Sequence, residues 1–469
     1  MALNRHFRNM LYLFSGDIAA RSLGFLATAY LARVLGKANF GVIHIALALL
    51  TYAMLLSNCG LTLWGTRRIA AGSDDAASLT GQVLFIRLML AFLTFLLVLC
   101  GIAFFSADPE IAQVVLVYQI YLFPAALLLD WYFQGRQQMA AVAGARFAGM
   151  LTYLLFVIFF VQHAGDVLNT AWGWVAGGIV NTLSLAWLFR RQGYLIRLRG
   201  AARHAFQRLR AAFPLGIAGL ISQVAIQFPV LYLGWFAGPE SAGIFSAAFR
   251  LTAMLLIFDR VFYTVFFPAI SQCARQTPER LEVVFGRILK IVIFTALSLS
   301  LLAICFAPEL LEMIFGAEYL AAVPAFRMLT GYFALTIINS VIGYTLLGMG
   351  QDRTFTRAFL TGLAVLLLSI YPLTAQFGSS GAVSALNLYQ LAALILMARA
   401  LRQQLPLRIF RHIVLPLSAT FLILSPAIYF LNWGLLGKLL FICVGGIPAI
   451  TGLSGIGREE IDYLKRALK

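Results

Sequence analysis

The chain of 469 residues is 61% hydrophobic and only 11% charged, with a mean hydropathy of +0.89. Soluble domains are about 45–50% apolar and about 25% charged, so this composition excludes a soluble protein with a large core. It predicts an all-α polytopic membrane protein. The net charge of +17 does not indicate nucleic-acid binding, because the basic residues lie in short loops between apolar runs, where they set topology.

The five cysteines form neither a metal motif nor a disulfide framework. They are scattered, mostly inside apolar runs, and are read as small reduced hydrophobic residues; they are Cys59, Cys100, Cys273, Cys305 and Cys443. The basic N-terminus leads into an apolar run that is too long for a cleaved signal. We therefore expect the first span to stay in the mature protein.

Apolar runs of about 20 residues mark the expected membrane spans. We predict fourteen spans, with twelve as the alternative because Pro426 and Pro448 interrupt the last two. In chain order they are 11–35, 41–64, 81–105, 111–133, 143–162, 168–189, 213–236, 243–267, 287–307, 324–348, 357–376, 382–400, 412–431 and 435–453.

The first helical hairpin of this pattern returns later in the chain. An apolar run carrying Asp17 and Arg21 ends in a G-x-x-x-x-G break at 36–41, and a shift of 202 residues gives the second break at 238–243. Under this shift Arg21 aligns with Gln223. Repeated halves are the usual build of a transporter, with the substrate site between them.

This repeat predicts two pseudo-symmetric six-helix lobes at 1–189 and 213–400. A basic connector at 190–212 would join them, and an extra helix pair with a tail would follow at 401–469. Part of the connector can lie on the membrane as a basic amphipathic helix, and anionic lipid binding is a further role that we consider for it.

Loop charge predicts the orientation. Basic loops, among them the connector with its seven arginines, alternate with acidic loops such as those at 106–110 and 308–318. By the positive-inside rule both termini are expected on the cytoplasmic side of the bacterial inner membrane.

Several short segments then point to one family. The motifs, in order, are LARVLGKANFG at 31–41, SNCGLTLWGTRRIA at 57–70, FQGRQQ at 133–138, PELLEMIFGAEYLAAVPAFRML at 308–329 and LLGMGQDR at 346–353. With them the chain resembles, over about its first 400 residues, the polysaccharide flippases of the multidrug/oligosaccharidyl-lipid/polysaccharide exporter superfamily. The last helix pair would depart from the commoner twelve-span pattern of that family.

The resemblance implies two bundles in a V around a central cavity that opens alternately to either side. It also implies the substrate, an undecaprenyl-diphosphate-linked oligosaccharide that moves from the cytoplasmic to the outer leaflet. Membrane lipids and the polysaccharide polymerase machinery are further expected partners.

Charged residues inside the spans are the first site candidates. A charge at the bilayer centre costs roughly 2.5–3.5 kcal/mol on insertion scales, so it normally faces a cavity or a partner. Arg21 and Arg250 are expected to bind the diphosphate, since a guanidinium matches phosphate in a bidentate manner, and Arg87 is a third candidate that could instead snorkel to the headgroups. Arg21 could also merely neutralise Asp17, four residues earlier on the same helix face.

Other polar residues are assigned to gating, coupling or sugar contacts. Asp259 and Arg260 are expected to form a gate or interface pair near the cytoplasmic end of their span. The neutral candidates could bond sugar hydroxyls or hold helices together; they are Asn58, Gln119, Asn181, Gln223, Gln227 and Asn339.

No catalytic, ATP-binding or metal motif is found in the sequence, so we expect a secondary transporter without a cofactor. Energy would come from an ion gradient or the membrane potential, with Asp17 as the coupling carboxylate. The alternatives are a multidrug exporter of the same superfamily, a lipid-II flippase of the same fold, and a membrane-bound glycosyltransferase or polymerase. Cationic drugs would favour acidic cavity residues, whereas the charges here lean to arginine.

Overall fold

The computed structural model describes residues 2–72, 76–104, 108–197, 205–274 and 278–404. Side chains are described from Ile18 onward, with some exceptions inside helices α9 and α11. The two spans predicted at 412–431 and 435–453 lie outside the described residues. Within the described ranges every regular element is a helix.

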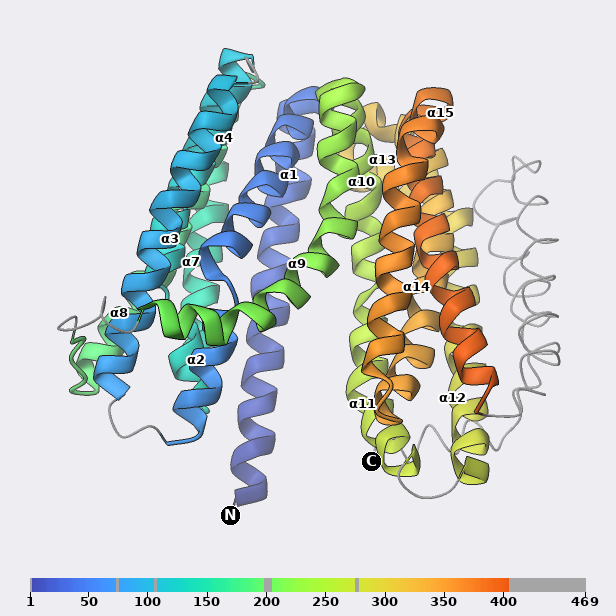
Figure 1. Ribbon diagram of the computed structural model, residues 1–469. Helices are drawn as coiled ribbons and strands as arrows, with labels where there is room; N and C mark the ends of the chain where they lie inside the picture. Colours follow the sequence, from blue (N-terminus) through green and yellow to red (C-terminus); the bar gives the residue numbers. More distant parts are fainter. Residues whose placement is uncertain (1, 73–75, 105–107, 198–204, 275–277, 405–469) are drawn as a thin grey trace. The chain divides into compact units, whose positions relative to one another are not determined.

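The helices confirm a multi-pass membrane protein. In the described part of the chain, nine helical stretches are long and apolar enough to cross a membrane. Two of these stretches are hairpins that a glycine breaks, at Gly36 in α1 (Ala2–Asn58) and at Gly378 in α15 (Asp352–Arg402). In each of them Figure 1 shows the chain running to the glycine and returning beside itself. Every predicted span up to 382–400 falls mainly on helical residues, although 41–64, 111–133 and 243–267 each cross a break between helices.

The chain divides into two compact units, Met1–Gly243 and Ile244–Lys469. After α1, the first unit contains α2 (Leu61–Ala70), α3 (Ala76–Phe104), α4 (Pro109–Ile120), α5 (Leu122–Leu127), α6 (Asp130–Gly135), α7 (Met139–Phe160), α8 (Val167–Arg191), α9 (Ala205–Phe236) and the start of α10 (Gly238–Leu255). Helix α1 packs on α7, α9, α3 and α4, and α7 packs on α8.

The second unit starts within α10 and is built around α14. It continues with α11 (Ile257–Ala274), α12 (Pro278–Cys305), α13 (Ala307–Phe315), the 3₁₀ helix η2 (Ala317–Ala322), α14 (Val323–Gly348) and α15. Helix α14 packs on α15, α12 and α11 around buried Phe285, Leu289, Phe333 and Ile337.

Helix α9 belongs to the first unit because it packs on α1. The boundary between the units therefore falls after α9, later than the predicted connector at 190–212. The six-helix lobes at 1–189 and 213–400 stay a prediction.

The first glycine of each break in the sequence repeat has a positive φ. Gly36 has φ 71° and Gly238 has φ 84°, a left-handed region that glycine enters without steric cost. The two positions are those that the shift of 202 residues brings into alignment. The backbone thus has a positive φ at both equivalent glycines, and the repeat itself stays a prediction.

The glycines that end these breaks also pack against each other within the first unit. A Cβ on Gly41 would overlap the carbonyl oxygen of Pro239, and a Cβ on Gly243 would overlap the carbonyl oxygen of Lys37. Lys37 and Pro239 are themselves related by the same shift. Each half of this contact thus repeats the other, as in a two-fold interface.

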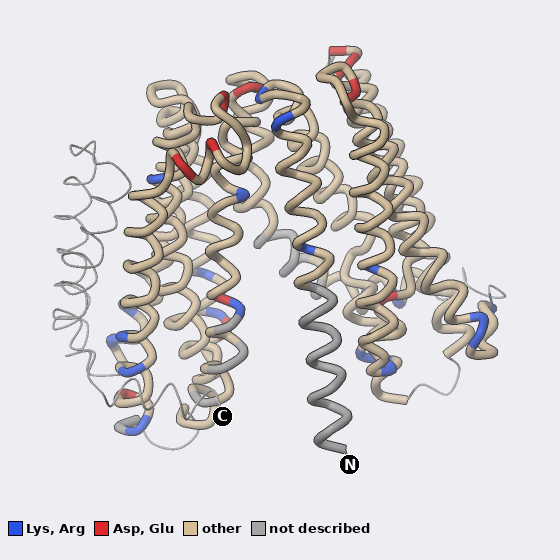
Figure 2. The backbone as a smooth tube through the Cα atoms, turned by 180° about the vertical axis from the view of Figure 1, so that it is seen from behind, with Lys and Arg blue, Asp and Glu red and all other residues tan. Residues whose placement is uncertain are grey.

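Charge separates along the first unit. Asp108 and Glu110 lie at the end that contains the Gly36 turn, whereas the arginines of α2 and of the α8 C-terminus lie at the opposite end. Figure 2 shows acidic positions at the first of these ends and basic positions at the second; Arg33 and Lys37, beside the Gly36 turn, are exceptions. This distribution agrees with the alternation of loop charge in the sequence.

Candidate transport site

The fourth span of the first unit is broken into three short helices, α4, α5 and α6. The second break follows α5, where Leu128 adopts an extended ψ of 129°. A break inside a membrane span frees carbonyl groups, and each of them needs a partner because lipid offers none.

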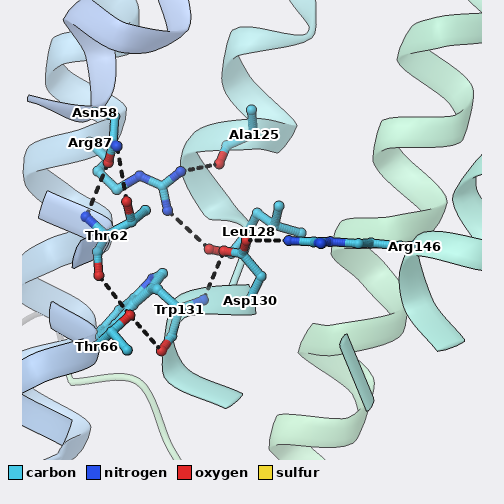
Figure 3. A network of polar contacts seen from close by, with 9 residues as sticks. All are labelled: Asn58, Thr62, Thr66, Arg87, Ala125, Leu128, Asp130, Trp131 and Arg146. Atoms are coloured by element: carbon cyan, nitrogen blue, oxygen red, sulfur yellow. Dashed lines mark hydrogen bonds and ion pairs between the residues drawn. The ribbon is translucent and has the colours of Figure 1, made fainter. Parts of the chain in front are cut away.

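Arg87 of α3 supplies that partner. Its side chain is 7% exposed, and its guanidinium donates to the carbonyl oxygens of Ala125, at 2.6 Å, and Leu128, at 3.0 Å (Figure 3). The described conformation therefore turns this guanidinium toward the protein backbone. It does not snorkel to the headgroups, and a diphosphate could reach it only if these two bonds broke.

The same break holds a second polar pair. Asp130 begins α6, accepts from the backbone N–H of Trp131 at 2.8 Å and lies 3.5 Å from the guanidinium of Arg146 on α7. Thr66 of α2 donates to the carbonyl oxygen of Trp131 at 3.1 Å, as Figure 3 shows. These contacts tie α2, α6 and α7 together around the broken span.

Asn58 acts on the neighbouring break between α1 and α2. Its Oδ1 accepts from the backbone N–H of Thr62 at 3.1 Å, and its Nδ2 donates to the Thr62 hydroxyl at 2.9 Å. Cys59 and Gly60, between them, have positive φ. The geometry thus favours a helix-joining role for Asn58 over a sugar contact.

Arg21 is exposed on the first limb of α1. At 1.5 Å per residue it lies about 22 Å from the Gly36 turn, well inside the membrane span. The side chain of Asp17 lies outside the described residues, so the predicted pairing of these two charges stays a prediction. An exposed guanidinium at this depth is expected to contact water, a partner or an anionic substrate.

Helix α9 adds neutral polar groups on the side that packs on α1. Gln227 is half-buried, with Nε2 3.4 Å from the hydroxyl of Thr51, and Tyr52 donates to the carbonyl oxygen of Val224 at 3.2 Å. Gln223 is half-buried one turn earlier. Two of the six predicted sugar contacts, Gln223 and Gln227, therefore lie beside α1.

Gln119 is enclosed within the first unit, whereas Asn181 is half-buried there. Gln119 is 0% exposed, and neither of its amide atoms has a hydrogen-bond partner among the described residues. Asn181 packs where α7 and α8 come closest, next to Gly149 and Gly177. In this conformation Gln119 is covered by protein and Asn181 is half-buried, and their roles as sugar contacts stay predictions.

In the second unit, Arg250 is half-buried in α10, about 18 Å along the helix from Gly238. The helix ends at Leu255, and α11 starts at Ile257. Discontinuous helices of this kind frequently bound the sites of secondary transporters. The predicted site residues Arg21 and Arg250 thus lie one in each unit.

Asp259 and Arg260 follow the break between α10 and α11. Asp259 is half-buried and hydrogen-bonded to Ser340 of α14, while its Oδ1 has no partner among the described atoms. Arg260 is exposed. At about 30 Å from Gly238, the two charges lie near the edge of the span, where a gate would be expected.

Asn339 holds two helices of the second unit together. Its Nδ2 donates to both the backbone carbonyl, at 2.8 Å, and the side-chain Oε1, at 2.7 Å, of Gln390 on α15. Gln390 in turn donates to Thr336 at 2.8 Å. Sequence reasoning missed Gln390, although a lone amide inside an apolar span is the signal that marks such helix contacts.

Outside the spans, Asp166 orders the turn between α7 and α8. Backbone N–H groups of His163, at 2.9 Å, and Gln162, at 3.0 Å, donate to its carboxylate. These two bonds, that of His163 first, hold the pKa of Asp166 below its usual range. The described residues bring no three His, Cys, Asp or Glu side chains together as a metal would need, and the expectation of no cofactor stays a prediction.

The fold and its polar groups define a multi-pass helical membrane protein. The chain belongs to the polysaccharide biosynthesis protein family, because that family's model matches residues 6–274. This family is the one that the sequence motifs indicate.

The relatives carry names of transport proteins. The chain is 23% identical over 408 residues to a "Putative O-antigen transporter" of Shigella dysenteriae, covering 84% of this chain and all of the relative. It is 22% identical to the "Probable low-salt glycan biosynthesis flippase Agl15" of Haloferax volcanii, covering 81% of this chain and 79% of the relative.

Solved structures show the same fold. The lipid II flippase MurJ in its inward closed conformation superposes with a TM-score of 0.73 at 14% identity, over 95% of this chain and 98% of that one. An inward-facing multidrug resistance MATE family transporter of the MOP superfamily superposes with a TM-score of 0.65 at 16% identity, over 81% of this chain and 93% of that one. At these identities the likeness concerns the fold alone.

Proposed function

We propose that the protein moves an undecaprenyl-diphosphate-linked oligosaccharide from the cytoplasmic to the outer leaflet of the bacterial inner membrane. The glycan would serve the assembly of O-antigen, capsule or exopolysaccharide. Membership of the polysaccharide biosynthesis family supports a glycan as the cargo, and the names of the relatives support transport as the activity. The protein is then a transporter and not an enzyme.

The observation that carries the proposal is Arg21, an exposed arginine inside a membrane span. A diphosphate that crosses hydrocarbon needs a positive counter-charge, and arginine offers two parallel N–H donors to its oxygens. Arg250 offers a second such group in the other unit. Arg87 is a weaker candidate, because its donors already meet backbone carbonyls.

The repeated halves support alternating access, in which one repeat moves against the other around the cargo. An ion gradient or the membrane potential would drive this movement, with Asp17 and Asp259 as the carboxylates to test for coupling. The basic ends of the helices support cytoplasmic termini. The polysaccharide polymerase machinery would act on the delivered glycan.

A second candidate is a lipid-II flippase, because MurJ, which carries that name, shares the fold. A multidrug exporter is weaker, because cationic drugs would favour acids where this chain has Arg21 and Arg250. Both candidates lead to the same genetic test with different outcomes.

The test is deletion of the gene followed by analysis of lipid-linked glycans. The proposal predicts that undecaprenyl-diphosphate-linked oligosaccharide accumulates on the cytoplasmic side while surface polysaccharide is lost, and that the wild-type gene restores both. Accumulation of lipid II would favour the second candidate. Unchanged surface glycan with raised sensitivity to cationic dyes would contradict the proposal and indicate drug export.

A further inference from the structure

A groove with a volume of about 450 Å³ lies between α7 and α8 of the first unit. Its lining includes Ala140, Ala141, Gly144, Ala145, Ser184 and Trp187. Gly144 is exposed, and a Cβ built on it would meet no atom within 4 Å, so the groove is open at this point. The hydroxyl of Ser184 donates to the carbonyl oxygen of Val180, which leaves the lining largely apolar.

The surface around the groove is the kind that faces lipid. Phe147 is 40% exposed on α7, while Leu183 and Trp187 are 61% and 58% exposed on α8. Both helices are candidate membrane spans. An acyl chain therefore has access to the groove from the side, through the plane of the membrane.

One end of the groove opens among positive groups. Helix α8 ends with exposed Arg190 and Arg191, and the guanidinium of Arg191 lies 5.2 Å from the centre of the Trp187 ring. Figure 2 shows basic residues at this end of the first unit. Tryptophan is enriched at the interface between membrane and water, where lipid headgroups lie.

The N-terminus of α7 lies at the same end. Gln138 precedes α7 without a side-chain cap and accepts from the amide of Gln192, beyond the end of α8, at 3.0 Å. The free N–H groups of a helix N-terminus attract negative charge. The sequence contains no acidic residue between Asp166 and Glu240, so α8, the connector and α9 bring no negative charge to this end.

We propose that the groove is a binding site for an anionic phospholipid. The phosphate lies at Arg190, Arg191 and the start of α7, and one acyl chain lies along Gly144. The positive end of the groove would select an anionic headgroup, whereas its open apolar lining would accept acyl chains of different lengths. The leaflet supplies phospholipid in large excess over other anionic lipids, which favours phospholipid as the occupant. This site is independent of the proposed cargo and its arginines.

Binding can be measured on the full-length protein, purified in detergent and stripped of lipid. Native mass spectrometry would count the bound lipids during titration with phosphatidylglycerol or phosphatidylcholine. We expect the wild type to bind phosphatidylglycerol more tightly. Removing each charge in Arg190→Gln and Arg191→Gln is expected to weaken binding about fivefold, the ratio that corresponds to about 1 kcal/mol per basic residue at a lipid surface.

Gly144→Phe tests the groove itself, since its side chain would fill the open space without displacing protein atoms. It is expected to remove the tight phosphatidylglycerol adduct. Gly101→Phe is the matched control. Gly101 also has open space around it, but it lies near the C-terminus of α3 and does not line the groove. Arg33→Gln, at an exposed arginine three residues before the Gly36 turn of α1, controls for the loss of charge.

Unchanged phosphatidylglycerol binding in Gly144→Phe and in the two arginine variants would overturn the proposal. If the wild type bound phosphatidylcholine as tightly as phosphatidylglycerol, the site would not select the headgroup, and the proposal would also be overturned. Preference for undecaprenyl phosphate would assign the groove to the cargo lipid instead. A dimer that Gly144→Phe dissociates, without any change in lipid binding, would assign it to a second copy of the chain.

Discussion

Replacing Gly243 with alanine should push apart the two glycine breaks that meet in the first unit. The new Cβ would overlap the carbonyl oxygen of Lys37 and lie 3.1 Å from the backbone N of Gly41. Both neighbours are backbone atoms and cannot turn away as a side chain would. Overpacking of this kind costs typically 1–3 kcal/mol. Alanine recovers about 0.5–1 kcal/mol because it is the better residue in a helix interior, so a net loss of up to about 2.5 kcal/mol is expected.

The neighbouring ion pair should matter less. Lys37 and Glu240 lie 2.7 Å apart, but their side chains are 37% and 54% exposed. Exposed pairs contribute about 0.2–1 kcal/mol at most. Lys37→Ala should therefore lower stability less than Gly243→Ala.

The assay is the apparent melting temperature of the purified protein in one detergent. Gly41→Ala should behave like Gly243→Ala, because its Cβ would overlap the carbonyl oxygen of Pro239. The double variant should lose less than the sum of the two, since both substitutions strain one contact. Gly101→Ala and Gly144→Ala, which have open space, should be neutral or slightly stabilising. Equal melting temperatures for Gly243→Ala and Gly101→Ala would refute the reasoning.

Three further variants separate structural from transport roles. Arg87→Met should lower the melting temperature, because the carbonyl of Leu128 loses its donor at about 1–3 kcal/mol, while the carbonyl of Ala125 keeps the backbone N–H of Leu128; unchanged stability would contradict the assignment to the backbone. Asn339→Leu should lower stability by about 0.6–1.7 kcal/mol per interhelical hydrogen bond and leave surface glycan intact in cells. Loss of export at normal expression would instead support the predicted contact between Asn339 and the sugar. The carboxylate of Asp166 has its pKa below the usual value of about 3.9, so it stabilises the fold above that value, and this stabilisation is lost as pH falls through the folded-state pKa. Asp166→Asn should abolish this part of the dependence of melting temperature on pH. Identical pH dependence in the variant and the wild type would contradict the assignment.

The sequence predicted the spans well, because length and hydropathy depend on the bilayer and not on tertiary detail. The glycine breaks were also predictable, since Gly36 and Gly238 are the residues that enter a left-handed conformation at least cost. The mutual contact of Gly41 and Gly243 was not, because a repeat indicates equivalent positions but not which of them touch.

The candidate site was harder to predict, because charge inside a span indicates only that a partner exists. The partners of Arg87 are backbone carbonyls that become free where the chain leaves the helix at Leu128, and no residue pattern marks that break. Asn58 similarly joins two helices across Cys59 and Gly60. Depth along the helix, in contrast, is readable from residue number, and it places Arg21 inside the span.

The most direct test of the proposed function is transbilayer movement in vesicles that contain only the purified protein and an undecaprenyl-diphosphate-linked oligosaccharide. A membrane-impermeant glycosidase outside the vesicles would report how fast the inner-leaflet glycan becomes accessible under an imposed ion gradient. We predict rapid exposure with the wild type and with Arg33→Gln, and exposure close to that of protein-free vesicles with Arg21→Gln. Equal rates for Arg21→Gln and the wild type would contradict the assignment of the diphosphate site, and no exposure with the wild type would contradict the proposed cargo.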